Sequence, residues 1–188
     1  MKQGQVSRLV SEGEEAKALA DSILCGVRIY GGRAFDLEDG FDALCAFAAK
    51  EYSLAFSVIV KVKGNVASIN IYDADGLFPT SKEERAIEAA LARPTPTTVS
   101  AGETVVLEHD DRVKYRYALA LTETVPSLKG VRFNVKEKNA ASEFLYAVAE
   151  KLGAQVEYGN SDTENAFFVS EDGLYAEATL KDGTDCSF

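Results

Sequence analysis

Two apolar segments on either side of a Gly-Asn pair constrain the fold of this chain more than any other feature. The segments LAFSVIVKV and VASINIY flank Gly64-Asn65, a two-residue turn that needs the positive φ these residues tolerate. The pattern predicts an antiparallel hairpin with Lys63 opposite Val66. The pairs that then share one apolar face are Val62 with Ala67, Val60 with Ile69, and Val58 with Ile71. We therefore expect both strands to belong to a half-buried sheet.

Apolar residues three and four positions apart predict amphipathic helices in several places. In the first half they occupy residues 5–25 and 41–52, with a short strand VRIY and a loop GGRAFDLEDG between them. Ser81 and Glu84 form a capping box for a further helix, which should end before Pro94.

In the second half, alternation predicts another hairpin, in which TVVLE and RVKYRYALAL flank HDDR. A strand VRFNVK leads to a helix that begins at the N-cap Asn139 and ends before Gly153. Strands QVEY, AFFVS and LYAEATL follow. The predicted fold class is α+β, with mainly antiparallel β-hairpins packed against amphipathic helices.

The segment RPTPTTVSAG has the composition of a linker and lies near the middle of the chain. It divides an N-terminal α+β unit, residues 1–93, from a C-terminal α+β unit, residues 102–188, with the linker at 94–101. The sequences LCAFAAK and LYAVAEK resemble each other, and DGL occurs twice. Two related helix-hairpin units and one continuous domain both remain open.

Composition excludes several classes of function. The chain has 188 residues, 46% of them hydrophobic, which is sufficient for one good core or two small ones. Its formal net charge of −10 repels phosphate backbones and anionic lipids, so we expect neither direct nucleic-acid binding nor membrane binding. The longest apolar run is far shorter than a membrane span, and acidic residues stand where a signal peptide needs an apolar core. We predict a cytoplasmic protein.

Metal and disulfide chemistry are not expected. Cys25, Cys45 and Cys186 are widely spaced and form no Cys-x-x-Cys pair, and His109 is the single histidine. Cys25 and Cys45 both fall on apolar stripes, which indicates burial. His109 lies in EHDDR, which is typical of a solvated hairpin tip. No cofactor is predicted.

The segment NIYDADGLFPTS resembles the nucleophile loop of haloacid dehalogenase-like phosphatases. The resemblance implies that Asp73 attacks phosphorus, that Asp75 acts as general acid and base, and that both hold magnesium. Leu77 replaces the threonine usual in that family, and a tight antiparallel hairpin leads into the loop where the family has a central parallel strand. We therefore favour a turn, in which Asp side chains bond nearby amides and Gly76 accepts positive φ.

A basic face carries Arg112, Lys114 and Arg116. On the predicted strand, Tyr115 and Tyr117 point to the opposite side, so cations and aromatic rings do not form one platform for single-stranded nucleic acid.

The acidic residues of FDLEDGFD are the candidate partner-binding residues. They are Asp36, Glu38, Asp39 and Asp42. Negative charge before a helix stabilises the helix by itself, and the alternative is an acidic patch that engages a basic protein. We predict a non-catalytic acidic intracellular binding protein of the inhibitor, immunity or chaperone type. The alternatives are a magnesium-dependent phosphohydrolase using Asp73 and Asp75, and a structural or assembly subunit.

Overall fold

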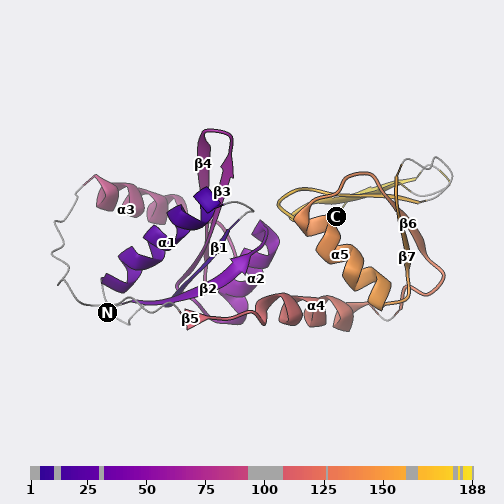
Figure 1. Cartoon of the computed structure of the whole chain (residues 1–188), viewed down its shortest axis with the longest axis horizontal. Helices are drawn as coiled ribbons and strands as arrows, with labels where there is room; N and C mark the ends of the chain where they lie inside the picture. Colours follow the sequence, from indigo (N-terminus) through magenta and orange to yellow (C-terminus); the bar gives the residue numbers. More distant parts are fainter. Residues whose placement is uncertain are drawn as a thin grey trace. The chain divides into compact units, whose positions relative to one another are not determined.

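A computed structural model describes residues 5–10, 14–29, 32–92, 108–125, 127–159, 165–179, 182 and 184–187. The chain groups into two compact units (Figure 1). The first contains Met1–Gly40 and Cys45–Asp111, and the second contains Phe41–Leu44 and Arg112–Phe188.

The first unit is built on a mixed sheet with the strand order β4-β3-β1-β2-β5. Its elements are β1 Gln5–Val10, α1 Glu14–Ile29, β2 Arg33–Asp39, α2 Asp42–Glu51, β3 Phe56–Lys63, β4 Val66–Asp73, α3 Ser81–Leu91 and β5 Glu108–His109. β1 pairs in parallel with β2 and with β3, and β2 pairs in parallel with β5. Of the strand pairs described in this sheet, β3–β4 alone is antiparallel.

The predicted hairpin at Gly64-Asn65 is confirmed in its register. Lys63 pairs with Val66, and the pairing continues without a shift to Phe56 and Asp73. The expectation of a half-buried sheet is wrong for β3, however, because β3 also pairs with β1 and four of its residues, 57–60, are buried. A strand with neighbours on both sides and helices on both faces has no solvent face.

The two faces of β3 contact different helices. Val58 and Val60 pack with Val6 of β1 and with Ala16 and Ala20 of α1 in one buried cluster. On the other face, the hydroxyl of Ser57 lies 3.1 Å from Cys45 Sγ of α2, and both residues are fully buried. The prediction that Cys45 belongs to the core is confirmed, whereas Cys25 is partly exposed.

Two elements of the first half differ from the prediction. Residues 5–10 form β1 and not the start of a helix, and residues 33–39 form β2 where a loop was expected. Val27, Arg28 and Ile29 of the predicted strand VRIY belong to α1, and Tyr30 lies outside the described residues. A short apolar run fits a helix or a buried strand equally well, and here the neighbouring strands decide between them.

α3 begins one residue earlier than the capping-box prediction. Thr80 is the N-cap, and its hydroxyl accepts from the Glu83 amide while the Glu83 carboxylate accepts from the Thr80 amide. The Thr80 hydroxyl also donates to the Glu83 carboxylate at 2.7 Å, and this hydrogen bond, together with the one from the Thr80 amide, holds the pKa of Glu83 below its usual value. Pro94 and the predicted linker 94–101 lie outside the described residues.

The second unit has a sheet with the order β10-β9-β8-β6-β7. Its elements are α4 Val113–Thr124, β6 Arg132–Val135, α5 Ala140–Lys151, β7 Gln155–Tyr158, β8 Ala166–Val169, β9 Ala176–Thr179 and β10 Asp185–Ser187. β6 pairs in parallel with β7 and β8, and β9 pairs antiparallel with β8 and β10. The predicted strands QVEY and AFFVS and the helix after Asn139 are confirmed, and of the predicted strand LYAEATL residues 176–179 form β9.

The predicted hairpin around HDDR is wrong, because residues 113–124 form the helix α4. Val113, Tyr117 and Leu121 are four residues apart and therefore share a helix face as readily as a strand face. Val113 is buried, and the ring of Tyr117 stacks on Phe144 with centroids 5.4 Å apart. Packing of this face against α5 thus selects the helix.

α4, α5 and one face of the second sheet line a half-open apolar pocket of about 220 Å³. Its lining includes Leu121 of α4, Leu145 and Tyr146 of α5, Phe133 of β6 and Phe167 of β8. Burial raises the pKa of Tyr146 to about 12.

The two units share a strand topology. In each, a central strand has the next strand of the chain on one side and an antiparallel hairpin on the other, as the orders β4-β3-β1-β2 and β9-β8-β6-β7 show. The expectation of mainly antiparallel hairpins is therefore wrong in detail, although helices, strands and antiparallel hairpins are all present. The equivalent helices of the two units are α1 and α5, because each follows the central strand of its sheet. LCAFAAK lies in α2 and LYAVAEK lies in α5, so these similar sequences do not occupy equivalent positions.

In the part of the chain that the structure describes, every helix is too short or too polar to cross a membrane.

Ile59→Ala should destabilise the first unit by about 2–5 kcal/mol, because Ile59 is fully buried in the interior strand β3 and the substitution leaves a cavity. Ile69→Ala is the matched control, since Ile69 lies on β4 and is 46% exposed. Urea unfolding followed by circular dichroism measures both. Equal losses of stability would contradict the buried position of β3.

Alkaline pH should destabilise the second unit through Tyr146. Its folded pKa is raised from an ordinary value of about 10, so the stabilisation is complete below that value and is lost as the pH rises toward about 12. Tyr146→Phe should flatten the decline in melting temperature over this range. Tyr115→Phe, at an exposed position of α4, should leave it unchanged.

Candidate functional site

The Asp73–Leu77 segment is a turn, as the sequence predicts. Asp73 Oδ1 accepts hydrogen bonds of 2.9 Å from the amides of Asp75 and Leu77. The Gly76 amide donates to the Asp73 carbonyl, and Gly76 has a φ of +76°. A Cβ atom on Gly76 would lie 2.7 Å from the Ala46 carbonyl oxygen. The Asp73 carboxylate therefore holds its own loop together.

The topology also argues against the dehalogenase-like alternative. β4 leads into this turn from the edge of the sheet and pairs antiparallel with β3, whereas that resemblance requires a central parallel strand. Within the described residues, no three acidic, histidine or cysteine side chains come close enough to hold a metal ion.

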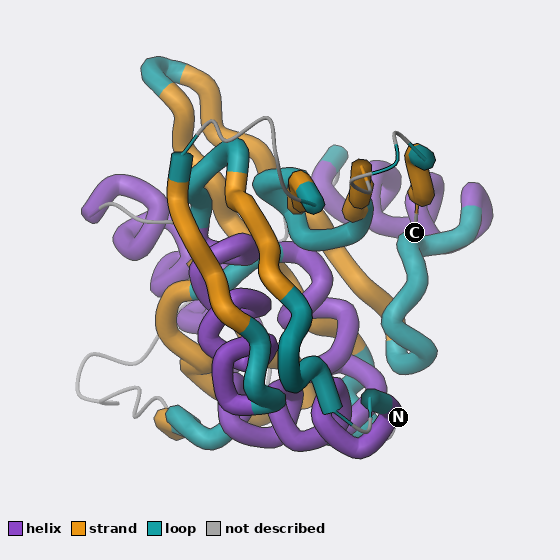
Figure 2. Tube along the Cα trace, turned by 90° about the vertical axis from the view of Figure 1, so that its right-hand side faces the viewer, coloured by secondary structure: helices purple, strands orange, loops and turns teal. Residues whose placement is uncertain are grey.

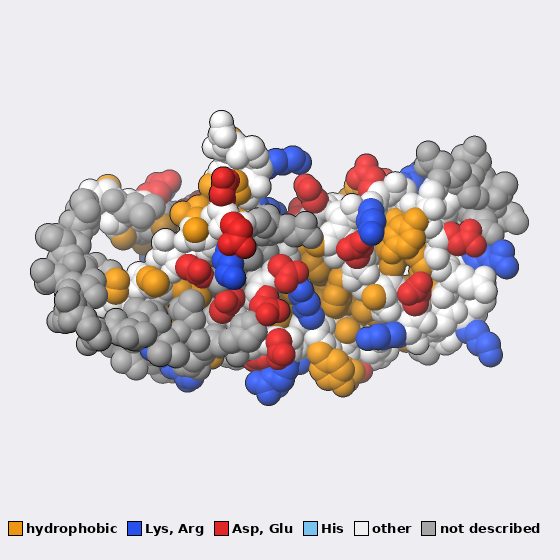
Figure 3. Space-filling model, in the orientation of Figure 1, with side chains coloured by type: hydrophobic (Ala, Val, Ile, Leu, Met, Phe, Trp, Pro, Cys, Tyr) orange, Lys and Arg blue, Asp and Glu red, His pale blue; other side chains and the backbone are white. Residues whose placement is uncertain are grey.

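The acidic residues predicted to bind a partner do not form one exposed surface. Asp42 is fully buried, so its carboxylate is not available to a basic partner. Asp36 is half-buried, and its Oδ1 accepts from the Glu38 amide, while Glu38 and Asp39 are exposed. Figure 3 shows acidic and basic side chains interspersed on one face of each unit.

The residues of the predicted basic face lie on and before a helix. Arg112 precedes α4, and Lys114 and Arg116 belong to it, so the strand alternation that separated them from the tyrosines does not apply. Tyr117 is packed inside the unit, and Tyr115 is exposed. The side chains of His109 and Cys186 lie outside what the structure describes.

The second sheet has a topological switch point between β6 and β8. From β6 the chain crosses through α5 to β7 on one side, and β8 lies on the other side of β6, parallel to it. In sheets of this kind the crevice outside the carboxyl ends of the strands is the usual ligand site. Here residues 136–139 leave β6 and residues 170–175 leave β8, so these two segments form the candidate functional site.

Asn139 joins the two segments. Its Oδ1 accepts from the Ser142 amide at 2.8 Å, and the Ser142 hydroxyl accepts from the Asn139 amide at 2.9 Å. The Asn139 side-chain amide also donates to the Val169 carbonyl, the last residue of β8. The start of α5 is thereby held against the end of β8.

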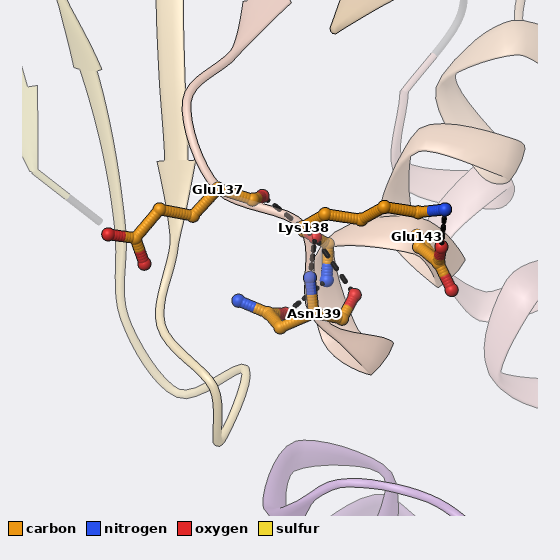
Figure 4. A network of polar contacts seen from close by, with 5 residues as sticks. Glu137, Lys138, Asn139 and Glu143 are labelled. Atoms are coloured by element: carbon orange, nitrogen blue, oxygen red, sulfur yellow. Dashed lines mark hydrogen bonds and ion pairs between the residues drawn. The ribbon is translucent and has the colours of Figure 1, made fainter. Parts of the chain in front are cut away.

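Lysines flank this helix start. Lys136 and Lys138 are exposed, and Lys138 Nζ lies 2.7 Å from Glu143 Oε1 in the first turn of α5 (Figure 4). The hydrogen bond and charge of Glu143 raise the pKa of Lys138, so this ammonium group stays protonated at neutral pH. The N-terminal end of a helix and adjacent cations both favour an anion.

The segment after β8 is a tight turn closed by its own side chains. Asp172 Oδ1 accepts from the Ser170 hydroxyl and from the Leu174 amide, and the Gly173 amide donates to the Ser170 carbonyl. Gly173 has a φ of +70° and lies against Phe41 and Ala141, so a side chain there would clash. In this turn, as in the Asp73–Leu77 turn, a glycine with positive φ donates its amide to the carbonyl three residues before it. Here the turn connects the two strands of the β8–β9 hairpin.

Sequence reasoning missed this site. It identified Asn139 as a helix cap and noted the DGL repeat, but it did not connect them, because β6 and β8 become neighbours only through the sheet. The signal that was available is the order strand, capped helix, strand, hairpin over residues 132–179, which is typical of a parallel crossover unit.

Two solved structures share the fold of the whole chain. The crystal structure of a putative phosphomannomutase from Thermus Thermophilus matches with a TM-score of 0.74 and 17% identity, covering 98% of this chain and 50% of that one. A phosphoglucomutase/phosphomannomutase family protein from Burkholderia thailandensis matches with a TM-score of 0.72 and 13% identity, covering 97% and 47%. This chain therefore spans about half the length of these structures. Neither a family model nor a curated protein matches the sequence.

These matches contradict the functional prediction made from the sequence. Both neighbours carry the names of phosphomutase enzymes, and this finding overturns the expectation of a non-catalytic inhibitor, immunity or chaperone protein. The prediction relied on net charge, which bears on solubility and on the charge of possible partners but does not indicate the fold.

Asn139→Ala should destabilise the second unit by about 1–2 kcal/mol, because it removes both the helix cap and the bond to Val169. Asn139→Asp retains the capping oxygen and removes the donor, so it should lose less. Urea unfolding distinguishes the two. Equal losses would show that the contact with Val169, and not the cap, carries the effect.

Proposed function

We propose that this protein is a phosphotransferase-type enzyme of the phosphomannomutase/phosphoglucomutase kind, with a phosphorylated sugar as substrate. The observation that carries the proposal is the fold match across both units, over 98% of the chain. A match to one unit alone would have much less weight, because single mixed sheets of this topology serve many functions.

The candidate site supplies chemistry that suits such a substrate. Phosphoryl transfer depends mainly on positioning and on stabilising negative charge. Lys136 and the start of α5 place positive charge at the carboxyl end of β6, beside the end of β8, and Lys138 adds a cation that is paired with Glu143 and for which a phosphate group would compete. Because the chain as a whole has a net charge of −10, binding of a phosphate group relies on such local cations.

Asn139 and the Ser170–Tyr175 turn have a positioning role in this proposal. Each is held by several hydrogen bonds, so the backbone around the crevice is rigid before a ligand arrives. A rigid site loses little entropy when a sugar phosphate binds. The predicted cytoplasmic location agrees with a soluble substrate of this kind.

Phosphorus NMR tests the activity directly. The protein is incubated with glucose 1-phosphate or mannose 1-phosphate, with and without magnesium, and a new phosphate-ester signal is the expected result. Lys138→Ala should lower kcat/KM by about tenfold or more, since it removes one cation from the site. Lys129→Ala is the control, because Lys129 is also exposed but precedes β6 at the opposite end of that strand.

Two outcomes would contradict the proposal. One is the absence of any new phosphate ester together with no thermal stabilisation by either sugar phosphate. The other is turnover that Lys138→Ala and Lys129→Ala reduce equally, which would place the phosphate elsewhere.

A further inference from the structure

A carboxylate of the chain itself is bound to one cation of the candidate site. Lys138 Nζ lies 2.7 Å from Glu143 Oε1. In Figure 4 these two side chains lie together, whereas the carboxylate of Glu137 points to the opposite side of the chain. A phosphate group that binds Lys138 must therefore displace Glu143 or share the ammonium group with it.

The backbone keeps Glu143 close to Lys138 even when the ion pair opens. The Glu143 amide donates to the Asn139 carbonyl at 2.9 Å, in the first turn of α5. Asn139 is the N-cap of that helix, and Lys138 is the residue before it (Figure 2 shows the helices of the chain). Because both side chains are attached to this short segment, the carboxylate has a high effective concentration at the ammonium group.

The ion pair is weak enough for a phosphate group to displace it. The side chains of Lys138 and Glu143 are 68% and 49% exposed, and exposed ion pairs gain little free energy from their attraction. A phosphate monoester has up to two negative charges and three acceptor oxygens, against the single charge of a carboxylate. Glu143 therefore lowers the affinity for phosphate but does not prevent binding.

Tyr158 keeps Lys138 in place when Glu143 is removed. Lys138 Nζ lies 6.0 Å from the centroid of the Tyr158 ring, at the end of β7. That ring meets the ring of Tyr146 of α5 edge to face, with centroids 6.0 Å apart. The attraction between an ammonium group and an aromatic ring does not need a carboxylate. Loss of Glu143 thus costs little positioning of Lys138 and removes the competing charge.

We propose that Glu143 is an internal competitor for phosphate at Lys138 and sets how tightly the candidate site holds a phosphate group. The inference rests on the proposed function, because it takes Lys138 as a ligand of the substrate phosphate. In the ligand-free protein the carboxylate binds the ammonium group, and the phosphate group replaces it. The same competition favours release of the product, a step that limits many enzymes.

Titration of the full chain with inorganic phosphate at constant ionic strength, followed by NMR of the backbone amides, tests the proposal without any turnover. Glu143→Gln should lower the dissociation constant for phosphate by about two- to fivefold, the range that an exposed ion pair accounts for. Glu150→Gln is the matched control, since Glu150 is exposed on the same helix, roughly 10 Å further along it, and its substitution changes the net charge equally. It should bind phosphate as the wild type does.

A double-mutant cycle with Lys138→Ala tests whether the gain depends on the lysine. In the Lys138→Ala background, Glu143→Gln should lose most of its effect, because there is no ammonium group to compete for. Three outcomes would overturn the proposal. They are phosphate binding by Glu143→Gln that equals or is weaker than that of the wild type, a gain of the same size without Lys138, and no phosphate binding by either protein.

The phosphate titration and the turnover assay separate this inference from the proposed function. Phosphate binding that Glu143→Gln tightens, in a protein that converts neither sugar phosphate, would contradict the enzymatic activity and support this inference. Conversion of a sugar phosphate, together with a phosphate affinity that Glu143→Gln leaves unchanged, would contradict this inference and support the activity.

Discussion

The parallel pairing of a central strand with neighbours on both sides is the constraint on which each unit depends. β1 lies between β2 and β3, and β6 lies between β7 and β8. Parallel neighbours require a crossover, and the helices α1 and α5 supply it. Where helices cover both faces of such a strand, all its side chains are buried. Hydrophobic and polar residues therefore do not alternate along it. This single arrangement determines which segments are core and where the ends of the parallel strands meet.

The same arrangement positions the candidate site. The segments after β6 and β8 are separated in sequence by a helix and a strand, and the parallel pairing of Val135 with Phe167 brings their ends together. The bond from Asn139 to Val169 then holds the helix start against the neighbouring strand. The start of α5, Lys136 and Lys138 lie at this edge, and the hydrogen bonds of Asn139 fix the backbone beside them.

Turn chemistry explains the aspartates of the two Asp-Gly segments. In Asp73–Leu77 and in Ser170–Leu174, a carboxylate accepts from amides of its own loop, and a glycine with positive φ packs closely against a neighbour. In a turn of this kind the acidic group has a structural role. The sequence motif alone does not distinguish this role from catalysis, because both need aspartate and glycine at the same spacing.

Local chemistry determined the elements whose residues act on their immediate neighbours. The hairpin at Gly64-Asn65, the cap at Asn139 and the Asp73 turn all depend on residues within a few positions of one another, and the sequence alone was sufficient to predict them. Tertiary packing decided the rest. Residues 5–10 became a strand because β2 and β3 lie beside them, and residues 113–124 became a helix because Tyr117 packs against Phe144. The candidate site belongs to this second group, since its two segments meet only through a sheet whose partners are distant in sequence.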